Sequence, residues 1–78
     1  MIDKGQFHPM LAKRARVATV ADDDILFRDG LDMGSLAFTE FIMEVEEETG
    51  IDIDPDRLDP SIKTVGQLYD VIARMAAA

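Results

Sequence analysis

The 78-residue chain contains no cysteine. It can therefore form neither a disulfide nor a thiolate zinc site, and it offers no thiol nucleophile. This absence is typical of a protein from a reducing compartment. The first residues lack the apolar core of a signal peptide, and no later apolar run approaches the length needed to span a membrane. We expect a soluble, cytoplasmic protein without a membrane partner.

Histidine is almost as scarce as cysteine. His8 is the only one, and the sequence reveals no Ser-His-Asp or similar hydrolase pattern around it. A chain of this length is one small domain with room for one core and one site. We expect a single domain over residues 1–78 that is not an enzyme, with no catalytic residues.

Basic side chains are few in the middle of the chain. The formal net charge is −8, and residues 29–59 hold eleven acidic residues against Arg57 alone. Phosphate contacts need lysine and arginine, so a nucleic-acid partner is not expected. The acidic segment instead indicates a partner with a basic surface. The alternative is a solvated acidic face that only keeps the protein soluble.

Alternating carboxylates over residues 52–56 resemble part of a calcium-binding loop. However, Arg57 stands at the turn-glycine position and Lys63 at the position of the bidentate glutamate, so a true EF-hand is not expected. We expect no specific metal site. Loose binding of divalent cations to these acids stays an alternative.

Apolar periodicity predicts helices and no strand. A helix is expected from Ser35 to Thr49, where Gly50 ends it. Thr64 and Gln67 have the spacing of a capping box at the start of a last helix. The expected buried stripes are Phe38, Phe41, Ile42, Val45 and Thr49 in one helix, and Val65, Leu68, Tyr69, Ile72 and Ala76 in the other.

Two prolines define the remaining elements. Pro55 follows a capping aspartate and predicts a short helix over residues 55–59. Pro9 is expected to open the first helix, because proline breaks a helix interior, and residues 1–8 would then be disordered. A long loop is expected over residues 19–34. Its apolar residues at 25–27 and Leu31 should pack it against the helices. The predicted fold is all-α, a small four-helix bundle with a long first loop and a short third helix.

The outer side of the helix from Ser35 to Thr49 combines apolar and acidic residues. Leu36, Glu40, Met43 and Glu47 lie at i, i+4, i+7 and i+11, nearly opposite the buried stripe, and Glu44 lies beside them. We call these five residues the docking face. An apolar strip bordered by carboxylates suits binding to a basic protein surface. Alternatively, Leu36 and Met43 are ordinary exposed residues.

Ser35 stands where the loop passes into this helix. It could simply cap the helix N-terminus. Alternatively, its hydroxyl carries a phosphate-linked group, because a helix N-terminus offers free amide donors to an anion. Gly34 leaves room there for such a group and for the enzyme that installs it.

These residues resemble a known family. The run Phe27-Arg28-Asp29-Gly30-Leu31-Asp32-Met33-Gly34-Ser35-Leu36, the acidic helix over residues 37–53 and the segment Lys63-Thr64-Val65-Gly66-Gln67-Leu68 are similar to acyl carrier proteins. The likeness extends from about residue 25 to residue 72. The family fold is a four-helix bundle with a long first loop and a short third helix.

The resemblance implies a function. Family members carry a covalent 4′-phosphopantetheine arm on the serine of an Asp-Ser-Leu motif, which matches Ser35. A phosphopantetheinyl transferase installs the arm from coenzyme A, and the arm's thiol holds acyl or aminoacyl groups as thioesters. The further implied partners are a loading ligase and downstream transferases with basic docking surfaces. Because recognition in the family uses the second helix, the docking face is assigned to these contacts, and we expect a monomer.

Gly34 departs from the family pattern, since the aspartate of the motif is missing there. The first helix is also irregular, because it holds Pro9 and the basic cluster Lys13, Arg14 and Arg16, which could otherwise be a solvated helix face. Together these features favour a specialised carrier over a housekeeping fatty-acid carrier. The pathway stays open among fatty acid, polyketide, nonribosomal peptide, aminoacyl and lipid-modifying chemistry. The alternative function is an acidic helical adaptor that binds a basic partner through its second helix and is never modified.

Overall fold

The computed structural model describes residues 3–27, 30–53, 58 and 61–77, with Ser35 and Ala77 described by their backbone. Within these residues the protein contains three helices, α1 (Lys4–Ala15), α2 (Ser35–Thr49) and α3 (Val65–Ala77). The same residues form no strand, only an isolated antiparallel bridge between Ile25 and Thr64. The all-α prediction is confirmed. The short helix expected at residues 55–59 falls, apart from Leu58, outside the described residues, so the four-helix bundle stays a prediction.

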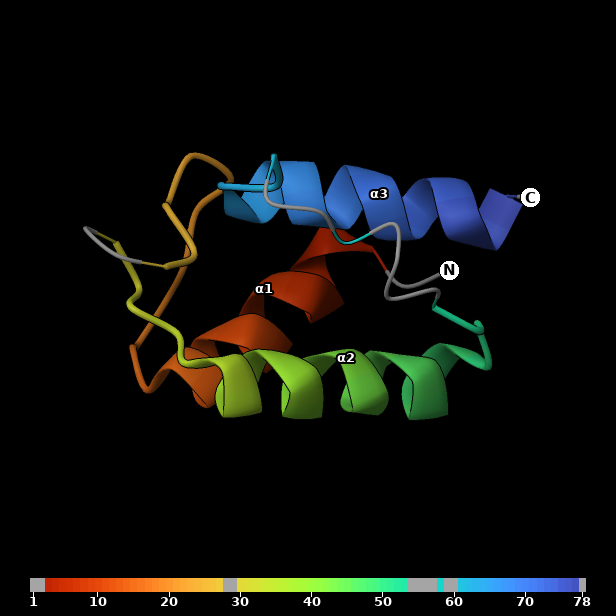
Figure 1. Cartoon of the computed structure of the whole chain (residues 1–78), viewed down its shortest axis with the longest axis horizontal. Helices are drawn as coiled ribbons and strands as arrows, with labels where there is room; N and C mark the ends of the chain where they lie inside the picture. Colours follow the sequence, from red (N-terminus) through yellow and green to blue (C-terminus); the bar gives the residue numbers. More distant parts are fainter. Residues whose placement is uncertain (1–2, 28–29, 54–57, 59–60, 78) are drawn as a thin grey trace.

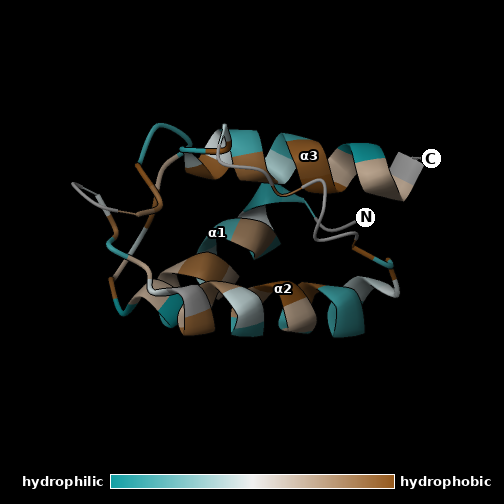
Figure 2. Ribbon diagram, in the orientation of Figure 1, coloured by the Kyte–Doolittle hydropathy of each residue, from teal (hydrophilic) through white to brown (hydrophobic). Residues whose placement is uncertain are grey.

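The helices enclose a small core. In Figure 1, α2 and α3 run along the two long sides of the molecule in the same direction, and α1 passes obliquely between them. The loop between α1 and α2 covers the end at which α2 and α3 begin. Figure 2 shows apolar segments of α2 and α3 on the sides that face α1. The first residues of α2 therefore lie at the end of the bundle that this loop covers.

Phe7 lies at the centre of the core. Its ring is fully buried and packs edge-to-face on Phe41 of α2 (centroids 5.3 Å apart) and on Tyr69 of α3 (5.1 Å). One side chain of α1 thus contacts both other helices, and such aromatic pairs add stability beyond their buried area. The predicted core residues buried with it are Phe41, Ile42, Val45, Val65, Leu68 and Ile72, whereas Phe38, Thr49, Tyr69 and Ala76 are half-buried.

The beginning of α1 differs from the prediction. The helix starts at Lys4, five residues before Pro9, and Pro9 lies inside it. Asp3 is the N-cap, and its Oδ1 accepts a hydrogen bond from the backbone N–H of Gln6 at 3.0 Å. The expectation that Pro9 opens the helix is wrong, because residues 4–8 already belong to α1. Disorder of residues 1–8 stays a prediction.

The physical reason is that proline removes a single backbone donor here. The missing N–H at Pro9 would have bonded to the carbonyl of Gly5, in the first turn of the helix. Phe7 and Leu11 lie on either side of this gap and are both fully buried. Burying two large apolar side chains contributes about 1.5–3 kcal/mol each, which together offsets the roughly 3 kcal/mol that a proline costs in a helix interior. Tertiary packing therefore keeps the helix continuous through the proline.

The predicted ends of α2 and α3 are confirmed. Gly50 ends α2 in the left-handed conformation (φ 72°), and its N–H donates to the carbonyl of Glu46 at 2.8 Å. At the start of α3, the Gln67 N–H donates to Thr64 Oγ1 at 3.2 Å, and the Thr64 N–H donates to Gln67 Oε1 at 3.1 Å. These reciprocal bonds are the predicted capping box.

The loop before α2 is attached to α3 through its backbone. The Leu26 N–H donates to the Lys63 carbonyl at 2.8 Å, and the Val65 N–H donates to the Asp24 carbonyl at 3.0 Å. Leu26 is fully buried, as expected, but its neighbours Ile25 and Phe27 are 41% and 37% exposed. Alternate residues of an extended segment point to opposite sides, so only the middle residue of the three reaches the core.

Candidate functional site

Ser35 is the first residue of α2. The N-cap position before it belongs to Gly34, whose carbonyl accepts the N–H of Phe38 at 3.0 Å. The alternative in which Ser35 is the capping residue is therefore wrong. The serine occupies the first helical position, where backbone N–H groups have no partner within the helix.

Gly34 leaves this helix start open. Its backbone is extended (φ −76°, ψ 164°), a conformation that any residue can adopt, and no side chain caps the helix there. Apart from its two chain neighbours, a Cβ atom placed on Gly34 would meet no atom within 4 Å. Neither backbone geometry nor packing requires glycine at this position, so the missing side chain leaves free space beside Ser35.

The segment that leads to Ser35 is folded tightly back on the loop. The N–H of Leu31 donates to the Ile25 carbonyl at 2.7 Å, and the N–H of Met33 donates to the Leu26 carbonyl at 3.0 Å. A Cβ atom on Gly30 would lie 2.1 Å from the Ile25 carbonyl oxygen, which leaves room only for glycine. Met33 is buried although no helical or strand period predicted it. These contacts set the point at which α2 begins.

A ring contact joins this loop to the first turn of α2. The rings of Phe27 and Phe38 lie 5.4 Å apart at an angle of 58°. Phe27 is 37% exposed, and Leu36 is 71% exposed. Both side chains therefore expose apolar surface to solvent at positions near Ser35 in the sequence. Sequence periodicity placed Phe38 in the core stripe but did not predict its loop partner.

The five residues of the docking face are more exposed to solvent than those on the opposite side of α2, as expected. Met43 is 54% exposed, Glu40 and Glu47 are exposed, and Glu44 is half-buried. On the opposite side, Phe41 and Val45 are fully buried. The positions of the docking-face residues agree with the helical period, whereas their role in docking stays a prediction.

The structure adds Arg14, in the last turn of α1, to the docking face. Arg14 Nε donates to Glu44 Oε1 at 2.9 Å, and Arg14 Nη1 donates to Glu40 Oε2 at 3.1 Å. Together with Met43 and Glu47, these three residues line an open groove of about 310 Å³. The sequence does not predict this pairing. Arg14 is separated by 26 positions from Glu40 and by 30 from Glu44, and such distant residues meet only because α1 packs on α2.

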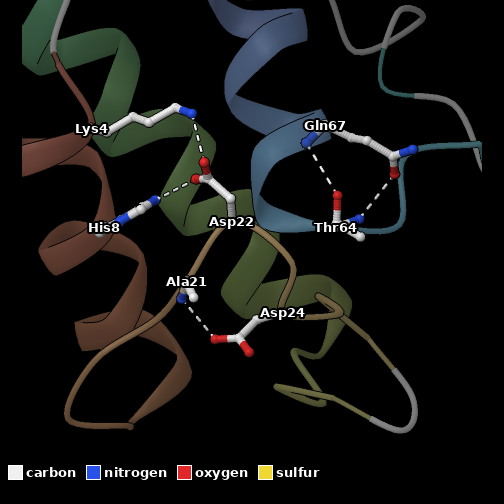
Figure 3. A network of polar contacts seen from close by, with 7 residues as sticks. All are labelled: Lys4, His8, Ala21, Asp22, Asp24, Thr64 and Gln67. Atoms are coloured by element: carbon white, nitrogen blue, oxygen red, sulfur yellow. Dashed lines mark hydrogen bonds and ion pairs between the residues drawn. The ribbon is translucent and has the colours of Figure 1, made fainter.

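A second polar cluster attaches the loop to α1 (Figure 3). The Asp22 carboxylate pairs with Lys4 Nζ at 2.6 Å and with His8 Nε2 at 2.9 Å. The hydrogen bond from Lys4 lowers the pKa of Asp22, and His8 adds to this effect. The same bond raises the pKa of Lys4. The Asp22 carbonyl also accepts the N–H of Gly66 at 2.8 Å, so one residue joins the loop to both α1 and α3.

Metal-ligating groups and membrane-spanning helices can be assessed only in the described part of the chain, which leaves out residues 54–56 of the acidic run. Its histidine and acidic residues form no group of three that could hold a metal ion. None of its helices is both long enough and apolar enough to cross a membrane.

Comparison with known proteins gives one match. A model of the family described as phosphopantetheine attachment site matches residues 7–72, which is most of the chain and includes all of α2. No curated protein and no solved structure matches significantly. The match confirms the resemblance found in the sequence and identifies covalent 4′-phosphopantetheine as the cofactor of the family.

Proposed function

The chain belongs to the phosphopantetheine attachment site family, and on this basis we propose that it is a carrier protein with 4′-phosphopantetheine attached to Ser35. The observation that carries the assignment is the position of Ser35 at the start of α2, directly after an uncapped glycine with open space around it. When bound, the arm supplies a thiol that holds acyl or aminoacyl groups as thioesters.

The residues around Ser35 suit a phosphodiester. A helix N-terminus offers unpaired N–H donors and the positive end of the helix dipole to an anion. The absence of a side chain at Gly34 leaves space for the phosphate and for the transferase that installs the arm from coenzyme A. The loop contacts at Gly30 and Met33 hold the first turn of α2 in place for this reaction.

The docking face provides the contacts with partner enzymes in this proposal. Leu36 and Met43 expose apolar surface, and glutamates border it. Apolar contact supports affinity, and the carboxylates steer and orient an arginine- or lysine-bearing partner. The partners are the transferase, an acyl- or aminoacyl-loading ligase and downstream transferases. We expect the carrier to act as a cytoplasmic monomer without catalytic activity of its own.

A loading assay tests the proposal. The purified protein is incubated with coenzyme A and a broad-specificity phosphopantetheinyl transferase, and its intact mass is measured. We expect a gain of one phosphopantetheine, lost in Ser35→Ala and retained in Ser61→Ala, a control at the only other serine. A gain that persists in Ser35→Ala would overturn the assignment of the site. No gain with several transferases would favour the unmodified acidic adaptor, which needs only the exposed docking face.

A further inference from the structure

Arg14 brings a positive charge into an otherwise acidic surface. Its guanidinium contacts both Glu40 and Glu44, and the three side chains are 32%, 48% and 23% exposed. Among the described residues, its neighbours Lys13 and Arg16 form no ion pair, nor does Glu47 across the groove. The docking face therefore has two carboxylates that share one internal cation, and a third, Glu47, that pairs with no cation of the described residues.

The ion pairs with Arg14 change which carboxylates are available to a basic side chain of a partner. Glu40 and Glu44 are four residues apart on one helix, and their mutual repulsion is relieved by Arg14. An arginine or lysine from a partner can pair fully with these carboxylates only by displacing Arg14. Glu47 requires no displacement, and it lines the same groove as Met43.

We propose that Arg14 is a specificity-determining residue of the docking face, an internal competitor for the basic side chains of partner enzymes. It weakens docking through Glu40 and Glu44. The face then prefers a partner that sets one basic side chain against Glu47 and an apolar side chain against Met43. Partners that rely on several arginines or lysines along α2 are disfavoured. This inference rests on the proposed carrier function.

Two other roles for Arg14 predict different results. If Arg14 only ties α1 to α2, its loss changes stability but not docking. If Arg14 itself contacts the partner, its loss weakens docking. Competition alone predicts that docking improves when the arginine is removed, since Glu40 and Glu44 become available.

The test measures loading kinetics with the transferase described above. Arg14→Met keeps most of the apolar stem and removes the charge, whereas Lys13→Met removes one positive charge next to it without breaking an observed ion pair. For Arg14→Met we expect the KM for the carrier to fall about two- to fivefold at low salt with kcat unchanged, the range typical of exposed ion pairs. Lys13→Met should stay close to wild type. Added salt should reduce the Arg14→Met effect, because salt screens exposed charges.

Two further variants connect the effect to the carboxylates. Arg14→Lys keeps the charge but not the two-point contact, so its KM should lie between those of wild type and Arg14→Met. Glu44→Gln should raise the KM more in the Arg14→Met background than in wild type, because only then does Glu44 bind the partner without competition. Thermal unfolding of every variant checks that each is folded under the assay conditions.

Several results would overturn the proposal. An unchanged or higher KM in folded Arg14→Met excludes competition, and so does an equal fall in Lys13→Met, which would mean that net charge alone governs docking. If Arg14→Met does not fold, an Arg14→Lys variant with wild-type KM is the contrary result. If the wild-type protein is loaded normally but the variants do not change the KM as expected, only the role of Arg14 is refuted and the carrier function stands. A wild-type protein that takes no arm refutes the carrier function as well.

Discussion

The two sides of α2 carry apolar side chains of similar size in opposite environments. Phe41 and Val45 on one side are fully buried, whereas Leu36 and Met43 on the other are 71% and 54% exposed. The buried side joins α2 to α1 through the ring contact between Phe41 and Phe7. Phe7 in turn contacts Tyr69 of α3. On the exposed side, Glu40 and Glu44 pair with Arg14 of α1, whereas Leu36 and Met43 stay largely in solvent. This apolar surface is available to another protein, which agrees with a carrier that must visit several enzymes.

The largest expected effect tests the buried side. Phe41→Ala should destabilise the protein by about 3–5 kcal/mol, because it removes a ring from the core and leaves a cavity. Leu36→Ala, the matched control on the exposed side, should change the free energy of unfolding by less than about 0.5 kcal/mol. Urea denaturation followed by circular dichroism measures both. Similar losses at the two positions would show that the orientation of α2 is wrong.

The two glycines before α2 also lie in opposite environments, since Gly30 is crowded and Gly34 is open. Gly30→Ala should cost about 1–3 kcal/mol, because the new methyl group collides with the Ile25 carbonyl and forces the backbone to shift. Gly34→Asp should instead stabilise the helix by about a few tenths of a kcal/mol, since space is open and aspartate is a good N-cap. Urea denaturation measures the free energy of unfolding of both variants. Equal destabilisation by the two substitutions would contradict the open space assigned beside Ser35.

The smallest effect concerns the exposed cluster around Asp22. Its lowered pKa means that the contribution of the Asp22 carboxylate is present above the usual value of 3.8 and is lost as the pH falls through the lowered pKa. The raised pKa of Lys4 means that its contribution is present below 10.5 and is lost as the pH rises through the raised pKa. Asp22→Asn should therefore lower the melting temperature near neutral pH and converge with wild type in strong acid.

Asp23→Asn is the control for this pH dependence. Asp23 is an exposed neighbour with no ion pair among the described residues. Its substitution should leave the melting temperature nearly unchanged across the same pH range. A difference between Asp22→Asn and wild type that persists undiminished in strong acid would exclude the ion pair as its cause.

Much of α2 and α3 was predictable because the signals are local. The period of 3.6 residues placed Phe41, Val45 and Leu68 in the core, and glycine and threonine chemistry set the helix ends. Ser35 was predicted as the attachment site from the residues around it. It lies within the matched residues 7–72, and its modification stays a prediction. In α1, the same local rules failed at Pro9 because packing outweighed the proline penalty.

Local sequence signals were enough to predict an all-helical, acidic protein with Ser35 at the start of a helix whose outer side combines apolar residues and glutamates. These properties depend on side-chain period, capping chemistry and charge, all of which act over a few residues. Three further features come from the packing of the helices: α1 continues through Pro9, Phe7 lies at the centre of the core, and Arg14 pairs with Glu40 and Glu44. Each of these depends on contacts between segments far apart in the chain, which form when the helices pack and which no local pattern encodes.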